Sequence, residues 1–261
     1  MPKKPERRPL LRDDKLSYLN RVFTLLQFLA DRNQGGVRVP EICEFLGVHR
    51  VTAHRLLRTL MELGYVEQGI DLSYRLGFEA WFLGFKADRQ FIPTELTAAM
   101  RRISEASEES VFLMRRAGAE GICIGEHEGS YPVRSKVMRV GARRHLGVGG
   151  ASVAILSGLH TDEAEELIDF NAKEYSRYSI TANDVRRFVA EARALGYAYS
   201  RGVVVAESRT LAVSLSAPSG TKAMMSLSIV TLESRLAEPR RSKLLEMLQT
   251  EAAAFRAAKV D

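Results

Sequence analysis

The 261-residue chain is long enough for a small domain beside a larger one, and its 46% hydrophobic residues can fill ordinary cores. Its apolar runs fall far short of the ~20 residues that span a bilayer, and the basic residues 1–12 lack the apolar stretch of a signal peptide. We therefore expect a soluble, cytoplasmic protein with no membrane partner. Cys43 and Cys123 make no disulfide framework and have no metal-ligand neighbours at useful spacing, so we expect no metal and no cofactor.

The formal net charge of +6 is concentrated in the first part of the chain. Residues 1–77 hold 13 Lys or Arg against 9 Asp or Glu, a difference of +4 that leaves +2 for the other 184 residues. Phosphate neutralisation dominates nucleic-acid affinity, so this excess suits a DNA-binding domain, although many domains that bind no DNA are equally basic. Residues 1–14 are predicted to be a flexible basic arm, which either touches phosphates or is a plain disordered terminus.

Two short helices joined by a glycine turn are predicted over residues 39–62. The first, at 39–46, has a proline in its first turn, and Gly47 makes the turn into the second. The second, at 50–62, is apolar on one face and basic on the other at helical spacing. This arrangement is typical of a helix-turn-helix that places its second helix in the major groove. The alternative is an ordinary surface helix with two arginines on its solvated face.

The neighbouring segments complete a winged domain over residues 15–77. Segments 65–68 and 72–77 alternate around a glycine-containing turn, which predicts a β-hairpin, the wing. A support helix is expected from Ser17 to about Ala30. The residues expected on its buried face are Leu19, Val22, Phe23, Leu26, Leu29 and Ala30.

These segments together resemble the IclR family of bacterial transcriptional regulators. The resemblance is carried by His54-Arg55-Leu56-Leu57, Gly64-Tyr65-Val66 and Tyr74-Arg75-Leu76-Gly77, and it covers almost the whole chain, weakening after about Ser200. It implies a dimeric regulator that binds operator DNA and a small-molecule effector.

The DNA contacts are expected on the second helix and the wing. Thr52, His54 and Arg55 should lie nearest the bases, and Arg58 or Arg75 nearer the phosphates. The family usually has a small hydroxyl residue where this chain has Val51, which would instead contact a thymine methyl. The full expected set is Arg50, Val51, Thr52, His54, Arg55, Arg58 and Arg75.

A linker helix is predicted over residues 78–92. It places Phe78, Trp81, Phe82 and Phe85 at i, i+3, i+4 and i+7, on one face. This aromatic stripe either docks onto its own domain or pairs with a second subunit. The resemblance implies the second, with Trp81 as an interface anchor in a homodimer or a dimer of dimers, a homotetramer.

Residues 93–261 show a mixed pattern of helices and antiparallel strands, which predicts an α+β domain. The resemblance implies that it is a GAF-like effector-binding domain. Thr181 and Asp184 stand at capping-box spacing. Helices are expected at 94–106, 153–156, 162–169, 181–195 and 240–255, and strands at 110–115, 121–125, 133–138, 197–200, 211–216 and 223–230, the last two joined by the turn Pro218-Ser219-Gly220.

The glycine-rich loop at residues 147–151 precedes a helix and offers backbone amides suited to a carboxylate, or else is a tight turn that needs glycine. It lacks the Lys-Ser/Thr ending of a nucleotide-binding P-loop. The resemblance implies an effector pocket between this loop and the sheet. Its expected residues are Gly147, Gly149, Gly150, Ala151, Ser200, Thr210 and Ser228.

Several of these positions depart from the family pattern. The family often has an acidic residue near Ser200, a cysteine at Thr210, a glycine at Glu207 and a proline at Ser214. Loss of the acidic residue removes a charge, so the small oxo-acid of some relatives is not the expected ligand.

We therefore expect a ligand-responsive transcriptional regulator of a catabolic operon, a repressor in preference to an activator, that senses an organic-acid or aromatic metabolite. The sequence contains no catalytic motif that would contradict this expectation. Gly-x-Ser-x-Gly, His-Glu-x-x-His and Gly-x-Gly-x-x-Gly before a βαβ unit are all missing, so we expect that the protein is not an enzyme. The alternatives are an enzyme or a protein-interaction module with an appended winged-helix domain.

Overall fold

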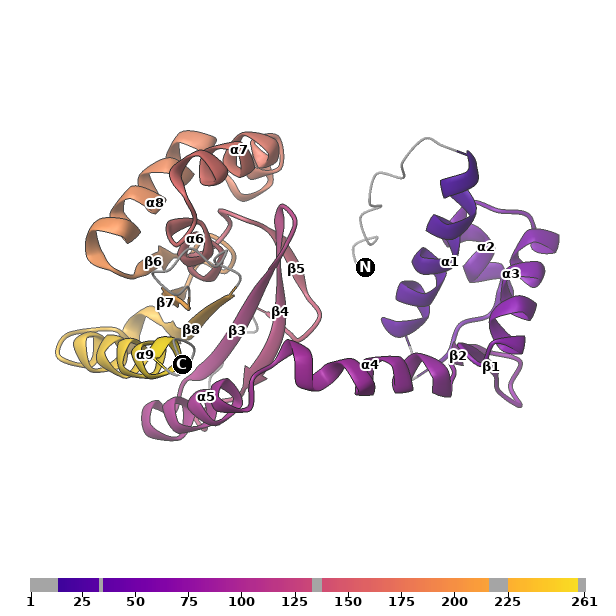
Figure 1. Ribbon diagram of the computed structural model, residues 1–261, viewed down its shortest axis with the longest axis horizontal. Helices are drawn as coiled ribbons and strands as arrows, with labels where there is room; N and C mark the ends of the chain where they lie inside the picture. Colours follow the sequence, from indigo (N-terminus) through magenta and orange to yellow (C-terminus); the bar gives the residue numbers. More distant parts are fainter. Residues whose placement is uncertain (1–13, 33–34, 133–137, 216–224, 258–261) are drawn as a thin grey trace. The chain divides into compact units, whose positions relative to one another are not determined.

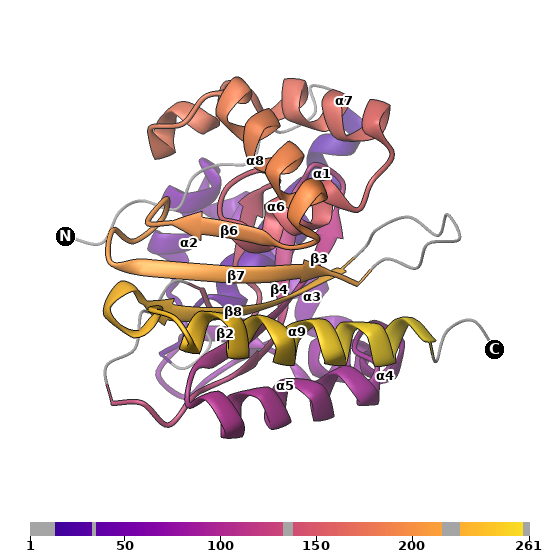
Figure 2. The same ribbon diagram turned by 90° about the vertical axis from the view of Figure 1, so that its left-hand side faces the viewer.

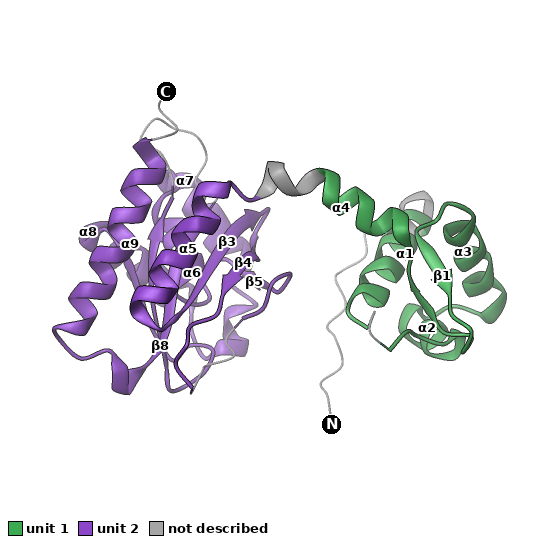
Figure 3. Cartoon of the chain, turned by 90° about the horizontal axis from the view of Figure 1, so that it is seen from below, with its two compact units in different colours: residues 1–88 green, residues 89–261 purple. Residues whose placement is uncertain are grey.

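The computed structural model describes residues 14–32, 35–132, 138–215 and 225–257, with the side chains of 14–17 and 87–91 excepted. The chain divides into two compact units, Met1–Asp88 and Arg89–Asp261, which are distinguished by colour in Figure 3 and described separately here. The predicted arm apart from Asp14, which begins α1, the predicted strand at 133–138 apart from Met138, and the predicted turn at 218–220 lie outside the described residues.

The first unit is a winged helix-turn-helix (Figure 1). The wing is an antiparallel hairpin in which Val66 pairs with Leu76 and Gln68 with Tyr74, and Val37 adds a bridge to Tyr74. The hairpin and the two short helices are therefore as predicted. In chain order the elements are α1 (Asp14–Ala30), α2 (Val39–Leu46), α3 (Arg50–Glu62), β1 (Val66–Gln68), β2 (Tyr74–Leu76) and α4 (Phe78–Phe91).

The buried face of α1 differs from the predicted one. Leu25, Phe28 and Leu29 are buried, whereas Leu19 and Phe23 are 53% and 63% exposed. Ala30 is also exposed, and Val22 and Leu26 are half-buried. Apolar residues occur nearly all round this helix, so their spacing does not select one face. The packing against α2 determines which face of α1 is buried, because the Phe28 ring stacks on Phe45 with centroids 3.9 Å apart.

The second unit is an α+β domain around one six-stranded antiparallel sheet, in the strand order β5-β4-β3-β8-β7-β6. Its strands are β3 (Ser110–Ala117), β4 (Glu120–His127), β5 (Arg143–His145), β6 (Ala198–Arg201), β7 (Ser208–Ser214) and β8 (Met225–Leu232). Its helices are α5 (Thr94–Ser107), α6 (Gly150–Ser157), α7 (Thr161–Asn171), α8 (Ala182–Leu195) and α9 (Arg240–Ala257), with 3-10 turns η1 (Tyr175–Tyr178) and η2 (Glu233–Arg235).

Helices cover both faces of this sheet. Figure 2 shows α5 and α9 side by side along one face, and α6 on the other with α7 and α8 beyond it. Side chains alternate between the faces along each strand. In β7, Leu211 and Val213 join the core under α5 and α9, while Thr210 and Ala212 face α6. The face under α6 carries the pocket described below.

Two details of this unit bear on the sequence predictions. The capping box of α8 is confirmed: the Thr181 amide donates to Asp184 Oδ2 at 3.0 Å, and the Asp184 amide donates to Thr181 Oγ1 at 3.2 Å. The strand β5 is not among the predicted strands, because its three polar residues show no apolar alternation. Along the described residues no helix is long and apolar enough to cross a membrane.

Candidate nucleic-acid interface and ligand pocket

One face of α3 anchors the helix and the opposite face is open. Ala53, Leu56, Leu57 and Leu60 recur at helical spacing and are at most 4% exposed, within the core of the first unit. Val51 on the other side is 82% exposed. The helix therefore presents a fixed outward surface without loss of its own packing.

The outward surface of α3 is basic. Arg50 and His54 lie one turn apart, and Arg50 Nε donates to His54 Nε2 at 3.4 Å. Arg55 and Arg58 are exposed, and among the described residues no ion pair is recorded for either guanidinium. Thr52 is half-buried beside them. Cationic side chains on an exposed helix face can reach phosphates and base edges.

Arg75, in the wing, has a different environment. Its Nη2 lies 3.3 Å from Asp71 Oδ2. Asp71 in turn accepts hydrogen bonds from the Ser73 hydroxyl and amide, which with the nearby arginine lower the pKa of this carboxyl. The charge of Arg75 is thus partly compensated within the hairpin, whereas those of Arg55 and Arg58 are directed outward.

Among the described residues, the aromatic side chains of α4 remain largely exposed. Phe78, Trp81 and Phe85 are 63%, 58% and 62% exposed, and Phe82 is half-buried. The rings contact one another, with centroids 5.2 Å apart for Phe78 and Trp81 and 5.1 Å apart for Trp81 and Phe85. Contiguous exposed apolar surface of this kind marks interaction sites.

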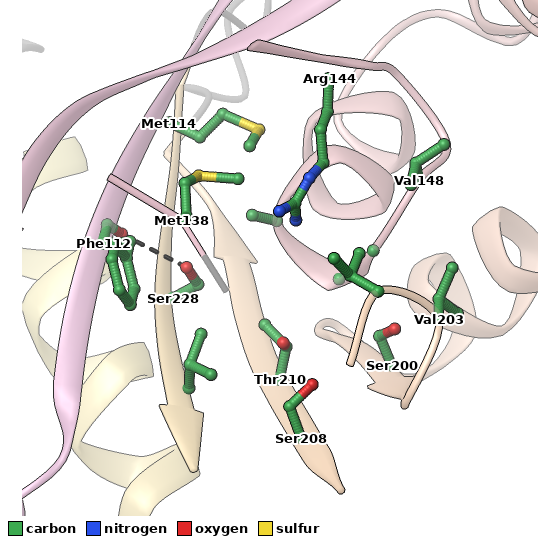
Figure 4. Close-up of a pocket in the computed structure, with 15 residues that line it drawn as sticks. Phe112, Met114, Met138, Arg144, Val148, Ser200, Val203, Ser208, Thr210 and Ser228 are labelled. Atoms are coloured by element: carbon green, nitrogen blue, oxygen red, sulfur yellow. Dashed lines mark hydrogen bonds between the residues drawn. The ribbon is translucent and has the colours of Figure 1, made fainter. Parts of the chain in front are cut away.

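A pocket that is partly open to solvent lies in the second unit between the start of α6 and the sheet. Six of the seven predicted effector residues line it: Gly149, Gly150, Ala151, Ser200, Thr210 and Ser228. The other lining residues are Phe112, Met114, Met138, Arg144, Val148, Val203, Val204, Ser208 and Val230 (Figure 4).

Strand register brings the sheet side of the pocket together. Ser228 of β8 pairs with Phe112 of β3, and its hydroxyl donates to the Phe112 carbonyl at 3.4 Å (Figure 4). Thr210 of β7 pairs with Ser200 of β6. Ser228, Thr210 and Ser208 are at least nine-tenths buried, so the wall combines buried hydroxyls with apolar side chains.

Gly147 is not among the lining residues. It has a φ of +101°, and a Cβ there would lie 2.7 Å from both the Tyr175 hydroxyl and Val185 Cγ1. Tyr175 Oη donates to the Leu146 carbonyl at 2.7 Å directly beside it. Both the backbone conformation and the core packing under the loop require glycine at position 147.

The backbone amides of the first turn of α6, which begins at Gly150, have no hydrogen-bond acceptor within their own helix.

Arg144 is the charged residue among the pocket residues that the sequence did not single out. Figure 4 shows its guanidinium directed into the pocket on the side of Met114 and Met138. Burial lowers its pKa, while the Tyr178 phenol and the Cys123 thiol raise it. An arginine remains protonated at neutral pH regardless, so the pocket contains a positive charge. The sequence feature that could have pointed to Arg144 is the pair of consecutive arginines, Arg143 and Arg144, just before the glycine-rich loop.

Cys123 lies on the pocket face of the sheet and is fully buried, in a small cluster with Phe112 and Val230. Burial raises the pKa of its thiol to about 11, so it is protonated at neutral pH. In the described part of the chain no three His, Cys, Asp or Glu side chains are grouped as metal ligands would be.

Two family models match the chain, one to each unit. The model described as "IclR helix-turn-helix domain" matches residues 19–69. The model described as "Bacterial transcriptional regulator IclR C-terminal" matches residues 86–256.

Curated relatives and solved structures agree with these matches. The chain is 30% identical over 133 residues to the HTH-type transcriptional regulator KipR of Bacillus subtilis, covering 50% of this chain and 52% of KipR, so it spans about half of that relative. It is 24% identical over 188 residues to the transcriptional repressor IclR of Escherichia coli, covering 69% and 68% of the two chains. An IclR homolog of Microbacterium hydrocarbonoxydans, crystallised in complex with 4-hydroxybenzoate, has the same fold, with a TM-score of 0.76 and 22% identity over 92% of this chain and 97% of that one.

Proposed function

The chain belongs to the IclR family of bacterial transcriptional regulators, and from this premise we propose that it represses a catabolic operon by binding operator DNA in the cytoplasm until a metabolite is bound. Its relatives are transcriptional regulators rather than enzymes. In the proposed division, residues 15–77 bind DNA, 78–92 link and dimerise, and 93–261 hold the effector.

The exposed basic face of α3 is the observation that carries the proposal. Arg50, His54, Arg55 and Arg58 project from a helix whose other face is locked into the core. A helix of this kind fits the major groove, where arginine reads guanine and phosphates fix the register. Val51 offers an apolar contact for a thymine methyl, and Arg75 and Thr52 complete the proposed surface.

The proposed effector site is the pocket at the start of α6. It contains buried hydroxyls, apolar side chains and one arginine, which suits a small organic acid or aromatic metabolite. The related homolog complexed with 4-hydroxybenzoate supports a ligand of this kind for the fold. The E. coli relative is named a repressor, which supports repression here.

Two copies would assemble through the aromatic stripe of α4, as a homodimer or a dimer of dimers. Two recognition helices on one assembly match the paired half-sites of an operator. A bound effector alters operator affinity only to the extent that it binds the DNA-bound and DNA-free forms unequally. In this proposal the linker helices transmit that difference.

The proposal is tested with fluorescence anisotropy on a duplex selected from a random library by the full-length protein. Arg55→Ala should weaken binding by about 1–3 kcal/mol if Arg55 contacts a base, or lower the salt dependence by about one counterion if it contacts a phosphate. Arg101→Ala is the control, because Arg101 is an exposed arginine on α5 outside the winged domain. Equal binding by the two variants would contradict the assignment of α3 to DNA.

A further inference from the structure

The open face of α3 carries a row of three basic side chains along the helix. Arg50, His54 and Arg58 are spaced four residues apart, so they follow one another at successive turns, and all three are exposed. Val51 and Arg55 lie in the neighbouring row. His54 therefore has one arginine a turn before it and another a turn after it.

The two arginines differ in their contact with His54. Arg50 Nε donates to His54 Nε2 at 3.4 Å, whereas within the described part of the chain no hydrogen bond joins Arg58 to His54. A protonated imidazole has no lone pair on either nitrogen, so this bond requires the neutral ring, which has one acceptor nitrogen. With Nε2 accepting from Arg50, Nδ1 carries the proton and cannot accept from Arg58.

The bond leaves the far end of the Arg50 side chain open. A guanidinium has five N–H groups, one on Nε and four on the two Nη atoms. His54 accepts from Nε, and among the described residues no acceptor is recorded for the Nη atoms of Arg50. Two Nη atoms side by side match O6 and N7 of guanine, the commonest specific contact in the major groove. The histidine thus holds the side chain without occupying the end that would read a base.

The position of Arg50 along the helix suits this role. Arg50 is the first residue of α3, and the N-terminal residues of a recognition helix contact base edges. A long, free side chain loses rotamer freedom when it binds a base, and a bond that already exists in the free protein reduces that loss. The contact with His54 therefore favours binding without itself touching DNA.

We propose that Arg50 reads a guanine in the major groove and that His54 is a positioning residue, which holds the guanidinium through its neutral Nε2. This inference rests on the proposed function, because it assigns roles within the α3 surface that binds DNA. It revises the sequence expectation, in which His54 itself lies among the residues nearest the bases. Loss of the imidazole lowers operator affinity through Arg50.

The test uses fluorescence anisotropy of the full-length protein on the selected duplex, with each guanine replaced in turn by 7-deazaguanine. This base has a C–H group in place of the N7 acceptor. The guanine that Arg50 reads is the one whose replacement weakens binding by wild type about tenfold and leaves binding by Arg50→Ala unchanged.

Two substitutions of His54 separate the acceptor from the rest of the side chain. His54→Leu has no acceptor, so it should weaken binding to the unmodified duplex about three- to tenfold and reduce the sensitivity to 7-deazaguanine at that position. His54→Gln has an amide oxygen that can accept from Arg50 Nε, so both properties should return to within about twofold of wild type.

A double-mutant cycle distinguishes positioning from a direct contact. In the Arg50→Ala background, His54→Leu should change affinity by less than about twofold. In the Arg58→Ala background it should keep its full effect, which makes Arg58 the matched control at the same distance along the helix. The three residues are exposed, so equal melting temperatures in circular dichroism should show that each variant is folded.

Any of four results would overturn the inference while wild type still prefers the selected duplex to a scrambled one. No guanine shows the Arg50-dependent response, His54→Leu binds like wild type, His54→Gln is as weak as His54→Leu, or His54→Leu has the same effect with and without Arg50. The last result would assign His54 a DNA contact of its own. Loss of the preference for the selected duplex in wild type would instead contradict the proposed function.

Discussion

Gly150, at the start of α6, lies directly against Thr210 of β7. A Cβ added to Gly150 would be 3.0 Å from Thr210 Cγ2 and 3.3 Å from the Thr210 carbonyl oxygen. The absence of a side chain thus sets how closely the first turn of the helix approaches the sheet. Because both residues line the pocket, the same contact fixes the width of the pocket at that point.

Gly150→Ala should lower the stability of the second unit by about 1 kcal/mol. Overpacking costs about 1–3 kcal/mol, and the better helix propensity of alanine offsets up to about 1 kcal/mol of it. In scanning calorimetry this corresponds to a decrease in Tm of roughly 2–4 °C for a unit of this size.

Thr210→Ser removes the methyl group that an alanine at position 150 would meet. The double variant should therefore be more stable than the sum of the single effects, by about 0.5 kcal/mol or more. Additive single effects would show that the close contact is not the source of the strain.

Tyr175→Phe should reduce stability at pH 8 by about 1 kcal/mol, since it removes the hydrogen bond from Tyr175 Oη to the Leu146 carbonyl. That carbonyl keeps the Asn171 amide as a donor at 3.3 Å.

The same variant tests a pH dependence. Burial raises the pKa of Tyr175 from 10.0 to about 12, so the unfolded chain ionises first and the stability from the neutral phenol is lost as pH rises from 10 to 12. The Tm difference between wild type and Tyr175→Phe should shrink over this range. A Tm difference that stays constant between pH 8 and 11.5 would be inconsistent with a buried, neutral phenol at Tyr175.

Trp81→Glu should convert a dimer to a monomer in sedimentation velocity, because a charge would be buried where the aromatic stripes meet. Leu83→Glu is the control. Leu83 is also on α4 and 60% exposed, but two residues turn it about 200° away from Trp81. The same mass for wild type and Trp81→Glu would exclude the stripe as the dimer contact.

The helices and the wing of the first unit were predictable because their local signals agree. The helix α3 has four buried residues at helical spacing and begins soon after Gly47, and its observed bounds, Arg50–Glu62, are the predicted ones. The face of α1 was not predictable in this way. Leu19 and Phe23 are as apolar as the residues that are buried, and only packing against Phe45 distinguishes Phe28.

The pocket was predictable only in part. The resemblance pointed to Gly149, Gly150 and Thr210, which the fold brings together. Arg144 was missed because its position depends on the pairing of a three-residue edge strand with Gly121. Three polar residues have no periodicity from which a strand, its register or the direction of its middle side chain can be read.

The central claim, that this protein recognises a DNA sequence through α3, is tested most directly by the ratio of two dissociation constants. Anisotropy would measure Kd for the selected duplex and for a scrambled duplex of equal length and composition at 0.15 M salt. A specific regulator should prefer the selected duplex by about a thousandfold or more. Equal affinity for the two duplexes would contradict the account and leave the winged domain as a general DNA- or protein-binding surface.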